Sequence, residues 1–504
     1  MNKQIYPAAR QLSSLATNHA RISQDVVIAG IHDNSANIQP GDAFLCLPRT
    51  GKSTQKYIEI AQKKGASAII LVGHDIKPDL PYMHLANMQA AGRMLRRWFN
   101  TEKSQVKLIG ITGTDGKTST TWMLRQAIQR LGFQAWSIGT LGCMYGENNC
   151  IELGNTTPSL LKMHQLYAQA HAAKVDTIVC EISSHGIEQQ RIAGLDFCAA
   201  LWTNLGHDHI DDHGSFQNYA NIKAHFLQQT YDQKGIIFAN ADCPNLKAFA
   251  PKKTRWYGQG LYRKKAIAMA WEQEIPSMLR LKPHTKNETD TEILIEDLPL
   301  GDFHAENTTA VAAILCSIFH TKITQLPEAL NHITAPPGRL QSIGLGAWQA
   351  FIDYAHTPEA LERCLRTVRL LCRYNIYLVF GCGGDRDKEK RPIMGNIATK
   401  FADHLWLTSD NPRSETPQVI IQDIFQGIPS KQHHKVHRQV DRRIAIFQAV
   451  NALQTGDILL IAGKGHESYM ETNDNRIAWS DQDIAINYLR QKQRSPHDMD
   501  ETTS

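Results

Sequence analysis

The run GTDGKTST (113–120) holds the residues whose types and spacing most clearly suit a chemical task. It follows the apolar stretch VKLIGIT and precedes a helical pattern, so a strand, a glycine-rich turn, a lysine and hydroxyl residues occur in that order. Backbone N–H groups in such a turn cradle phosphate oxygens. Lys117 is expected to reach the β- and γ-phosphates of a nucleotide, and Thr118 or Ser119 to ligate Mg²⁺. The strict phosphate-loop pattern is not met, because Ile111 stands where its first glycine would be.

A carboxylate and a histidine-rich segment follow this turn along the chain. Glu181 lies near the end of the apolar run VDTIVCE, where a carboxylate can hold Mg²⁺ at the carboxyl edge of a parallel sheet. The segment HDHIDDHG (207–214) contains three His and three Asp. Neither a cysteine nor an H-E-x-x-H motif accompanies it, which favours an oxygen-rich Mg²⁺ site over a transition-metal site, with a solvated polar loop as the alternative. Lys223 is, by pattern alone, a single lysine on a helix.

Three strand-like runs in the last third of the chain end in polar, glycine-containing turns. These turns are GCGGDRDKEKRP (381–392), SDNPRSE (409–415) and AGKGHES (462–468), and DYAHTP (353–358) adds an Asp and a His at another strand end. In an open α/β sheet the carboxyl ends of the strands border one crevice. The side chains expected to converge there are Arg386, Asp410, Asn411, Arg413, Lys464 and Glu467. Arginines beside acids suit a ligand with carboxylate and ammonium groups, such as an amino acid.

The elements that must position these residues fall into three regions. The polar join NTEKSQ (100–105) and the Pro- and Gly-containing join HITAPPGRL (332–340) separate them. The second and third regions alternate apolar strands with helical periodicity, which predicts βαβ units and a mostly parallel sheet. The fold class is therefore α/β. The expected regions are 1–103, 104–335 and 336–490, followed by a disordered polar tail, 491–504.

Composition excludes several classes of protein. The 504 residues are 42% hydrophobic and 20% charged, which is ordinary for a globular chain of about three domains. The formal charge of +5 is too small to argue for nucleic acid binding, and no apolar run is long enough for a transmembrane helix. The ten cysteines form no C-x-x-C pair, and no signal-peptide core is present. We therefore expect a cytoplasmic protein without disulfides.

From about residue 106 to 488 the chain resembles the Mur ligases, the ATP-dependent amide-forming enzymes of peptidoglycan synthesis, and in particular their diaminopimelate-adding branch. The resemblance rests on the following motifs: GTDGKTST, NTTP (155–158), EISSHG with Arg191, TNLGHDHIDDHG, the Lys223 helix, Asn307, PGR (337–339), DYAHTP, CGGDRDKEKRP, DNPR and GKGHE. It implies a three-domain architecture: a UDP-substrate-binding N-terminal domain, a central P-loop-like ATP-binding domain and a Rossmann-like C-terminal domain that binds the amino acid.

The resemblance also implies a reaction in two chemical steps. ATP phosphorylates the γ-carboxylate of the D-glutamyl residue of UDP-N-acetylmuramoyl-L-alanyl-D-glutamate, and the amine of meso-2,6-diaminopimelate then displaces phosphate. In the family the lysine matching Lys223 is carbamylated (N6-carboxylysine) and helps hold Mg²⁺. The implied catalytic residues are Lys117, Glu181, His209 and Lys223. The implied metal ligands are Thr118, Glu181, His209 and carbamylated Lys223.

The remaining implied contacts fall into three sets. The ATP-binding set is Gly113, Thr114, Asp115, Gly116, Lys117, Thr118, Ser119, Asn307, Arg339 and Asp353, with His356 in the same motif as Asp353. The set for the UDP-muramyl dipeptide is Asn34, Ser35, Thr156, Thr157, Ser183, Gln189 and Arg191. The diaminopimelate set is Arg386, Asp410, Asn411, Pro412, Arg413, Gly463 and Glu467. Lysine-adding relatives lack the arginine of DNPR, because L-lysine has no second carboxylate for it to grip.

Two departures from the family pattern leave alternatives open. Asp115 stands where the family has Asn, which predicts weaker ATP binding because a carboxylate near phosphates is unfavourable. The N-terminal segment reads Asp33-Asn34-Ser35 where the family has Asp-Ser-Arg. The alternatives are a paralogue that ligates an amino acid to a different carboxylate and a nucleotide-binding protein with impaired catalysis. The expected partners are small-molecule substrates, without nucleic acid or membrane, and the expected state is a monomer.

Overall fold

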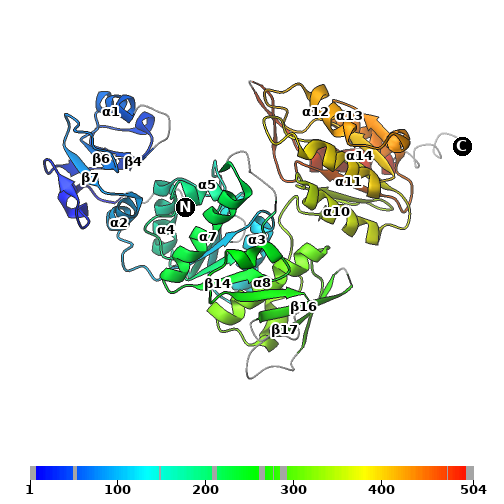
Figure 1. Ribbon diagram of the computed structural model, residues 1–504, viewed down its shortest axis with the longest axis horizontal. Helices are drawn as coiled ribbons and strands as arrows, with labels where there is room; N and C mark the ends of the chain where they lie inside the picture. Colours follow the sequence, from blue (N-terminus) through cyan, green and yellow to red (C-terminus); the bar gives the residue numbers. More distant parts are fainter. Residues whose placement is uncertain are drawn as a thin grey trace, which may run out of the picture.

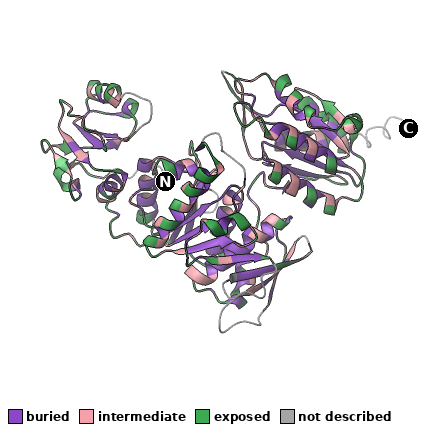
Figure 2. Cartoon of the chain, viewed as in Figure 1, coloured by how far each residue is buried: buried purple, intermediate pink, exposed green. Residues whose placement is uncertain are grey.

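A computed structural model describes residues 7–48, 54–146, 149–206, 213–259, 267–275, 277–283, 292–473 and 475–494. Figure 1 shows three α/β bodies in a row, each built around its own sheet, from the blue N-terminal body to the yellow and red C-terminal one. In all three bodies the inner strands are buried (Figure 2). The α/β class expected from the sequence is thus confirmed.

The N-terminal body contains a five-stranded sheet in the order β2-β7-β6-β5-β4. Its strands β4 to β7 are parallel and β2 is antiparallel to β7. Every residue of β5 and β6 is buried, as expected for inner parallel strands covered on both faces. The bounds are β1 Arg10–Gln11, β2 Arg21–Ile22, β3 Val27–Ile28, β4 Ile31–His32, β5 Ala43–Cys46, β6 Ala68–Val72, β7 Tyr82–Leu85, α1 Thr54–Lys63 and α2 Met88–Trp98.

The middle body is organised by an eleven-stranded sheet among the described residues, in the order β11-β10-β9-β12-β8-β13-β14-β15-β16-β17-β18. Strands β9 to β16 of this order are parallel, as predicted. The strand bounds are β8 Lys107–Thr112, β9 Ala135–Gly139, β10 Gly142–Tyr145, β11 Asn149–Ile151, β12 Thr177–Glu181, β13 Ala199–Trp202, β14 Ile236–Asn240, β15 Arg255–Gln259, β16 Ile267–Ile275, β17 Met278–Pro283 and β18 Ile293–Ile295. The helices are α3 Lys117–Arg130, α4 Leu160–Ala172, α5 Ser184–Glu188, α7 Phe216–Asp232, α8 Asp302–Ile318 and α9 Leu326–Leu330.

The C-terminal body has a six-stranded sheet in the order β19-β20-β24-β21-β22-β23, parallel except for β19. A separate hairpin, β25–β26, follows β24. The strands are β19 Gln341–Ser342, β20 Gln349–Asp353, β21 Ile376–Phe380, β22 His404–Leu407, β23 Val436–Arg438, β24 Ile458–Ala462, β25 Tyr469–Glu471 and β26 Arg476–Ala478. The helices are α10 Pro358–Leu371, α11 Lys390–Phe401, α12 Pro417–Gln426, α13 Arg442–Ala452 and α14 Asp481–Arg494.

Three sequence expectations can be compared directly with these elements. Helix α14 continues to Arg494, so the first four residues of the tail expected at 491–504 are helical, and the rest lie outside the described residues. All ten cysteines are free thiols, as expected. None of the helices in the described ranges is long and apolar enough to cross a membrane.

Candidate functional site

The glycine-rich turn between β8 and α3 is shaped by two glycines with positive φ. Gly113 has φ 151° and a Cβ there would come within 1.9 Å of Thr203 Oγ1, while Gly116 has φ 81° and directly precedes α3. The neighbouring strand end fixes the turn, because the Asp115 N–H donates to Asn204 Oδ1 at 2.8 Å and the Thr203 hydroxyl donates to the Asp115 carbonyl at 2.6 Å. The strand, the glycine-rich turn and the helix therefore follow one another as predicted, and phosphate binding by the turn stays a prediction.

Lys117 lines a cavity beside the turn, and the buried carboxylate of Glu181 lies close enough to interact with its charge. The Lys117 ammonium donates to the carbonyls of Gly113 and Thr114 at 2.8 and 2.7 Å. Glu181, at the carboxyl end of β12, is buried and accepts hydrogen bonds from the Thr118 and Thr140 hydroxyls at 2.9 and 3.1 Å. Burial raises the pKa of the Glu181 carboxyl, and the Lys117 charge opposes that shift.

Lys223 reaches this turn from α7. The residue is 1% exposed, and its ammonium donates to the Gly113 carbonyl at 3.0 Å and lies 4.5 Å from the centre of the Tyr219 ring. His213, just before α7, contacts the Ser184 hydroxyl through Nε2 at 2.9 Å. Lys223 is thus brought to the phosphate turn, although the sequence pattern alone did not distinguish it.

A second group of polar residues is connected through Thr157, and two of its members, Thr156 and Ser183, line the same cavity as the turn. Thr157 donates to the Glu181 carbonyl at 2.9 Å and accepts the Ser183 N–H at 2.9 Å, so these residues form one rigid corner. The Arg191 guanidinium donates to the Thr157 carbonyl at 2.6 Å and to Gln189 Oε1. The Thr156 hydroxyl contacts that of Thr140 at 3.1 Å. The structure therefore brings the middle-domain residues of the expected dipeptide set together.

The two remaining members of that set, Asn34 and Ser35, lie elsewhere. The Asn34 side-chain oxygen accepts the Ala36 N–H at 3.0 Å and caps a short helical turn, and Ser35 is buried. Neither residue lines a cavity with the middle-domain residues among the described pockets. His209 lies outside the described residues.

A cavity of about 170 Å³ joins the middle and C-terminal bodies above the phosphate turn. The middle body contributes Lys117, Lys223 and Thr118, whose hydroxyl donates to Glu181. The C-terminal body contributes Tyr354 and His356. Arg339 also lines it, with its guanidinium 4.6 Å from the centre of the Tyr354 ring.

A small adjoining pocket contains the other expected nucleotide residues. Asp115, Gly116, Ser119, Asn307, Arg339 and Asp353 all line it. Asn307 accepts the Thr120 hydroxyl at 3.0 Å, and Asp353 accepts the N–H groups of Leu340 and Ala355, both at 2.6 Å. Arg363 of α10 forms ion pairs with Asp302 and Glu306 of α8 at 3.3 and 2.9 Å, so a charged contact ties the two bodies beside this pocket.

The third-region turns converge, as predicted, in a pocket of about 690 Å³ at the carboxyl edge of the C-terminal sheet. Its lining includes Arg386, Asp410, Asn411, Arg413, Gly463 and Glu467, together with Tyr354 and His356. Pro412 lies in the same turn, and its carbonyl accepts the Glu415 N–H at 3.0 Å. Lys464 differs from expectation: it is fully buried beneath the pocket, where it donates to Asn411 Oδ1 and Glu467 Oε2 at 3.0 and 2.9 Å.

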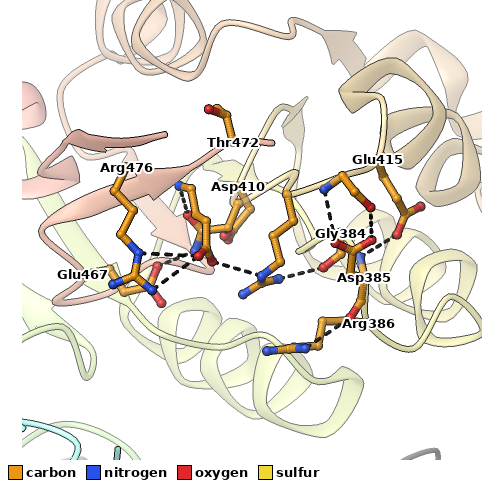
Figure 3. A network of polar contacts seen from close by, with 12 residues as sticks. Gly384, Asp385, Arg386, Asp410, Glu415, Glu467, Thr472 and Arg476 are labelled. Carbon is orange, nitrogen blue, oxygen red and sulfur yellow. Dashed lines mark hydrogen bonds and ion pairs between the residues drawn. The ribbon is translucent and has the colours of Figure 1, made fainter. Parts of the chain in front are cut away.

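A network of polar contacts around Asp385, Glu415 and Glu467 holds these turns together (Figure 3). Asp385 accepts the Ser414 N–H at 3.1 Å, and Glu415 accepts the Asp385 N–H at 2.6 Å, so each turn fixes the other. Buried Arg391 donates to both oxygens of Glu415, at 2.8 and 3.0 Å. Hydrogen bonds from Arg391 lower the pKa of the Glu415 carboxyl to about 2.

This low pKa predicts how the stability of the C-terminal body depends on pH. Because the folded pKa is below the ordinary 4.5, the stabilisation by Glu415 is complete above the ordinary value and is lost as pH falls toward 2. Glu415→Gln should unfold more easily than wild type by about 1–3 kcal/mol near neutral pH, with a smaller difference at about pH 3. Urea unfolding at both pH values measures this. Glu362→Gln, which alters an exposed ion pair on α10, is the control, and a pH-independent difference would contradict the prediction.

Several site residues were not found from the sequence. Thr203 and Asn204 hydrogen-bond to the phosphate turn, and Thr140 hydrogen-bonds to Glu181. Glu471 pairs with Arg413 at 3.1 Å. Arg363 links the middle and C-terminal bodies through Glu306. Their partners are distant in sequence, as with Thr203 and Asp115, which are 88 residues apart. Only the strand-end position of Thr203 and Asn204, next to the phosphate turn in a parallel sheet, was available as a signal.

Comparisons with known proteins agree with this arrangement. The Mur ligase middle domain matches residues 111–315, and the Mur ligase glutamate ligase domain matches residues 338–465. A UDP-N-acetylmuramoyl-L-alanyl-D-glutamate–2,6-diaminopimelate ligase of Syntrophomonas wolfei is 33% identical over 479 residues, covering 93% of this chain and 96% of that protein. The enzyme of the same name from Geobacillus thermodenitrificans is 34% identical over 472 residues, covering 91% and 94%. A solved structure of a ligase of that name superposes with a TM-score of 0.64 at 28% identity, covering 93% and 96%.

Proposed function

We propose a reaction for this chain on the basis of its family, because the chain belongs to the Mur ligases. It is an ATP-dependent, ADP-forming amide ligase that adds meso-2,6-diaminopimelate to UDP-N-acetylmuramoyl-L-alanyl-D-glutamate during the synthesis of peptidoglycan precursors in the cytoplasm. One observation carries the proposal. The phosphate-turn cavity and the arginine-containing pocket share Tyr354 and His356 as a common wall, so a phosphorylated acceptor and an amino acid can meet there.

The chain's own residues position the first step. The backbone of the turn and Lys117 bind the transferred phosphate. Ser183, which lines the same cavity, binds the acceptor together with Arg191, whose guanidinium donates to the nearby Thr157 carbonyl. Transfer of the γ-phosphoryl group to the D-glutamyl carboxylate gives an acyl phosphate and ADP. Because phosphoryl transfer depends on positioning and neutralisation of charge, a lysine held by two carbonyls beside the turn is suited to it.

Attack by the amino group completes the reaction. The amine of the amino acid, bound in the C-terminal pocket, attacks the acyl phosphate carbonyl, phosphate leaves and an amide bond forms. The amine must lose a proton before or during attack, and the Asp410 carboxylate, whose pKa burial raises, lies in the pocket that holds the ammonium end. Arg413 lines this pocket, and under this proposal its guanidinium binds the distal carboxylate, which L-lysine lacks.

The donor groups beside the turn fit Mg²⁺. Glu181 and the Thr118 hydroxyl provide hard oxygen atoms 2.9 Å apart at the N-terminus of α3, and Thr140 orients the carboxylate. When bound, Mg²⁺ neutralises charge on the phosphate oxygens. Carbamylation of Lys223 would convert a buried ammonium into a further oxygen ligand, and its position beside the Gly113 carbonyl supports this proposal. A loss of activity after bicarbonate is removed, restored by its addition, would test it.

Phosphate release by the purified protein tests the whole reaction. The assay contains ATP, Mg²⁺ and UDP-N-acetylmuramoyl-L-alanyl-D-glutamate, with meso-diaminopimelate or L-lysine added in separate reactions. We expect release and a tripeptide product with diaminopimelate only. Release without any amino acid would indicate a simple ATPase and contradict the proposal.

A different carboxylate acceptor is the second candidate, and the N-terminal body favours it. The segment Asp33-Asn34-Ser35 differs from the family's Asp-Ser-Arg, Ser35 is buried, and neither Asn34 nor Ser35 lines one of the described pockets with the middle-domain residues. Under this alternative the protein would release phosphate with diaminopimelate and an acceptor that lacks the UDP group. A comparison of acceptors with and without UDP separates the two candidates.

Substitution of Asp115 by asparagine is expected to strengthen ATP binding. Its side chain lines both nucleotide-side cavities, and its carboxylate adds a negative charge close to the phosphates. Asp115→Asn keeps the backbone N–H bond to Asn204 and should lower the KM for ATP about three- to tenfold, with a smaller change in kcat. Initial rates over a range of ATP concentrations measure this. Asp176→Asn, a substitution outside the site, is the control, and an unchanged KM in Asp115→Asn would contradict the prediction.

A further inference from the structure

The carboxylate of Glu471 lies against the guanidinium of Arg413, and none of the reaction steps above uses it. Its Oε2 is 3.1 Å from Arg413 Nε, and its Oε1 is 3.3 Å from Arg476 Nη2. Glu471 ends β25, so it comes from the hairpin that follows the GKGHE turn and not from the DNPR turn that carries Arg413. The pair therefore joins two segments 58 residues apart.

Backbone contacts fix Glu471 independently of its charge. The Arg413 N–H donates to the Glu471 carbonyl at 3.2 Å, and the Glu471 N–H donates to Asn411 Oδ1 at 2.8 Å. Arg413 has φ 50°, a left-handed conformation that is costly for a residue with a side chain and persists only where its surroundings hold it. The hairpin provides such a contact at the residue that faces the pocket.

These contacts determine which part of the Arg413 guanidinium is available to a ligand. Glu471 takes the Nε–H, and the Gly384 carbonyl accepts from Nη1 at 2.7 Å. A guanidinium has five N–H donors, and the others are all on the two Nη atoms. Since Arg413 lines the pocket, this edge is the part that can meet a carboxylate.

The charge of Glu471 does not cancel that of Arg413. Arg476 pairs with the same carboxylate, so this group of two arginines and one glutamate keeps a net positive charge. An anionic ligand group is therefore still attracted to the exposed edge.

We propose that Glu471 is a positioning residue that holds the Arg413 guanidinium with its Nη edge toward the pocket and so sets affinity for the distal carboxylate of the amino acid. The inference rests on the proposed function, because that carboxylate belongs to diaminopimelate. It predicts an effect on amino-acid binding and none on the phosphoryl-transfer site.

Steady-state kinetics of wild type, Glu471→Ala and Glu471→Gln test this role. Glu471→Ala should raise the KM for meso-diaminopimelate about tenfold, because an ionic hydrogen bond that orients Arg413 is lost. Its kcat and its KM for ATP should stay within about twofold of wild type. Glu471→Gln keeps an acceptor oxygen for Nε and should restore most of the affinity. Glu362→Ala, on the exposed face of α10, is the matched control.

The outcomes separate this inference from the proposed function. An unchanged KM in Glu471→Ala, with active wild type, overturns the inference alone. A lower KM also overturns it, because Glu471 would then compete with the ligand for Arg413. Equal KM increases in the Gln and Ala variants would show that charge, not orientation, matters. If wild type neither releases phosphate with diaminopimelate nor binds it by calorimetry, the proposed function fails, and the inference with it.

Discussion

Lys117→Ala is expected to lower kcat for ADP release about a thousandfold while leaving the protein folded. The Lys117 ammonium is the cation held at the phosphate turn by the Gly113 and Thr114 carbonyls, and removal of one preorganised donor from developing charge costs about 10²–10³ in rate. Its charge also opposes the rise that burial causes in the pKa of Glu181, so the variant loses support for an ionised carboxylate close to the turn. Coupled measurement of ADP release at saturating ATP gives kcat.

Two comparisons make the Lys117 result specific. Lys103→Ala removes an exposed lysine just before β8 and should leave kcat unchanged. Thermal unfolding should show a Tm for Lys117→Ala close to that of wild type, because water can hydrogen-bond to the Gly113 and Thr114 carbonyls in place of the lysine. If Lys117→Ala kept more than about a tenth of wild-type kcat while folded, phosphoryl transfer would not depend on this cavity.

The phosphate turn could be predicted because all of its signals are local. A strand, two glycines that need positive φ and a helix beginning at Lys117 occur within one short run. The crevice of the C-terminal body could be predicted for a similar reason, since parallel strands place their following turns at one edge. Arg386 and Arg413 line one pocket there although they are distant in sequence.

Pairings between distant segments could not be predicted in the same way. Lys464 was expected to line the crevice, but it is buried beneath it and donates hydrogen bonds to Asn411 and Glu467. The sequence shows only that these three residues lie near strand ends. The contact between Arg363 and Glu306 depends on how two bodies pack, which no local periodicity reports. The antiparallel strands β16 to β18 were also missed, since the expectation for this region came from βαβ alternation.

The N-terminal body shows which features of a segment a local sequence pattern can predict. The GDAFLCL run forms β5 as its apolar pattern predicts. The role of Asn34 as a helical cap was not predicted: its side-chain oxygen accepts the Ala36 N–H, while the residue stays exposed. The contact of Asn34 with the UDP-muramyl dipeptide stays a prediction.

Arg413→Ala is expected to lower kcat/KM for meso-diaminopimelate about a hundredfold and to leave kcat/KM for L-lysine nearly unchanged. The substitution affects the two amino acids differently. Diaminopimelate loses a bidentate partner for its distal carboxylate, whereas lysine has no distal carboxylate to bind. Glu471 would then pair with Arg476 alone, so the charge of this group of side chains would fall from net positive to neutral. Competition assays with both amino acids, followed by mass analysis of the products, measure the ratio.

Arg366→Ala, at an exposed ion pair on α10, controls for removal of an arginine. The comparison with Glu471→Ala is the more informative one. If Arg413 selects the substrate and Glu471 orients the Arg413 guanidinium, the effects of the two alanine substitutions on kcat/KM should not be additive. The double variant should resemble Arg413→Ala alone, because an orienting residue has no effect once the group that it orients is gone. Equal losses for diaminopimelate and lysine in Arg413→Ala would instead mean that this arginine supports the turn and does not recognise the carboxylate.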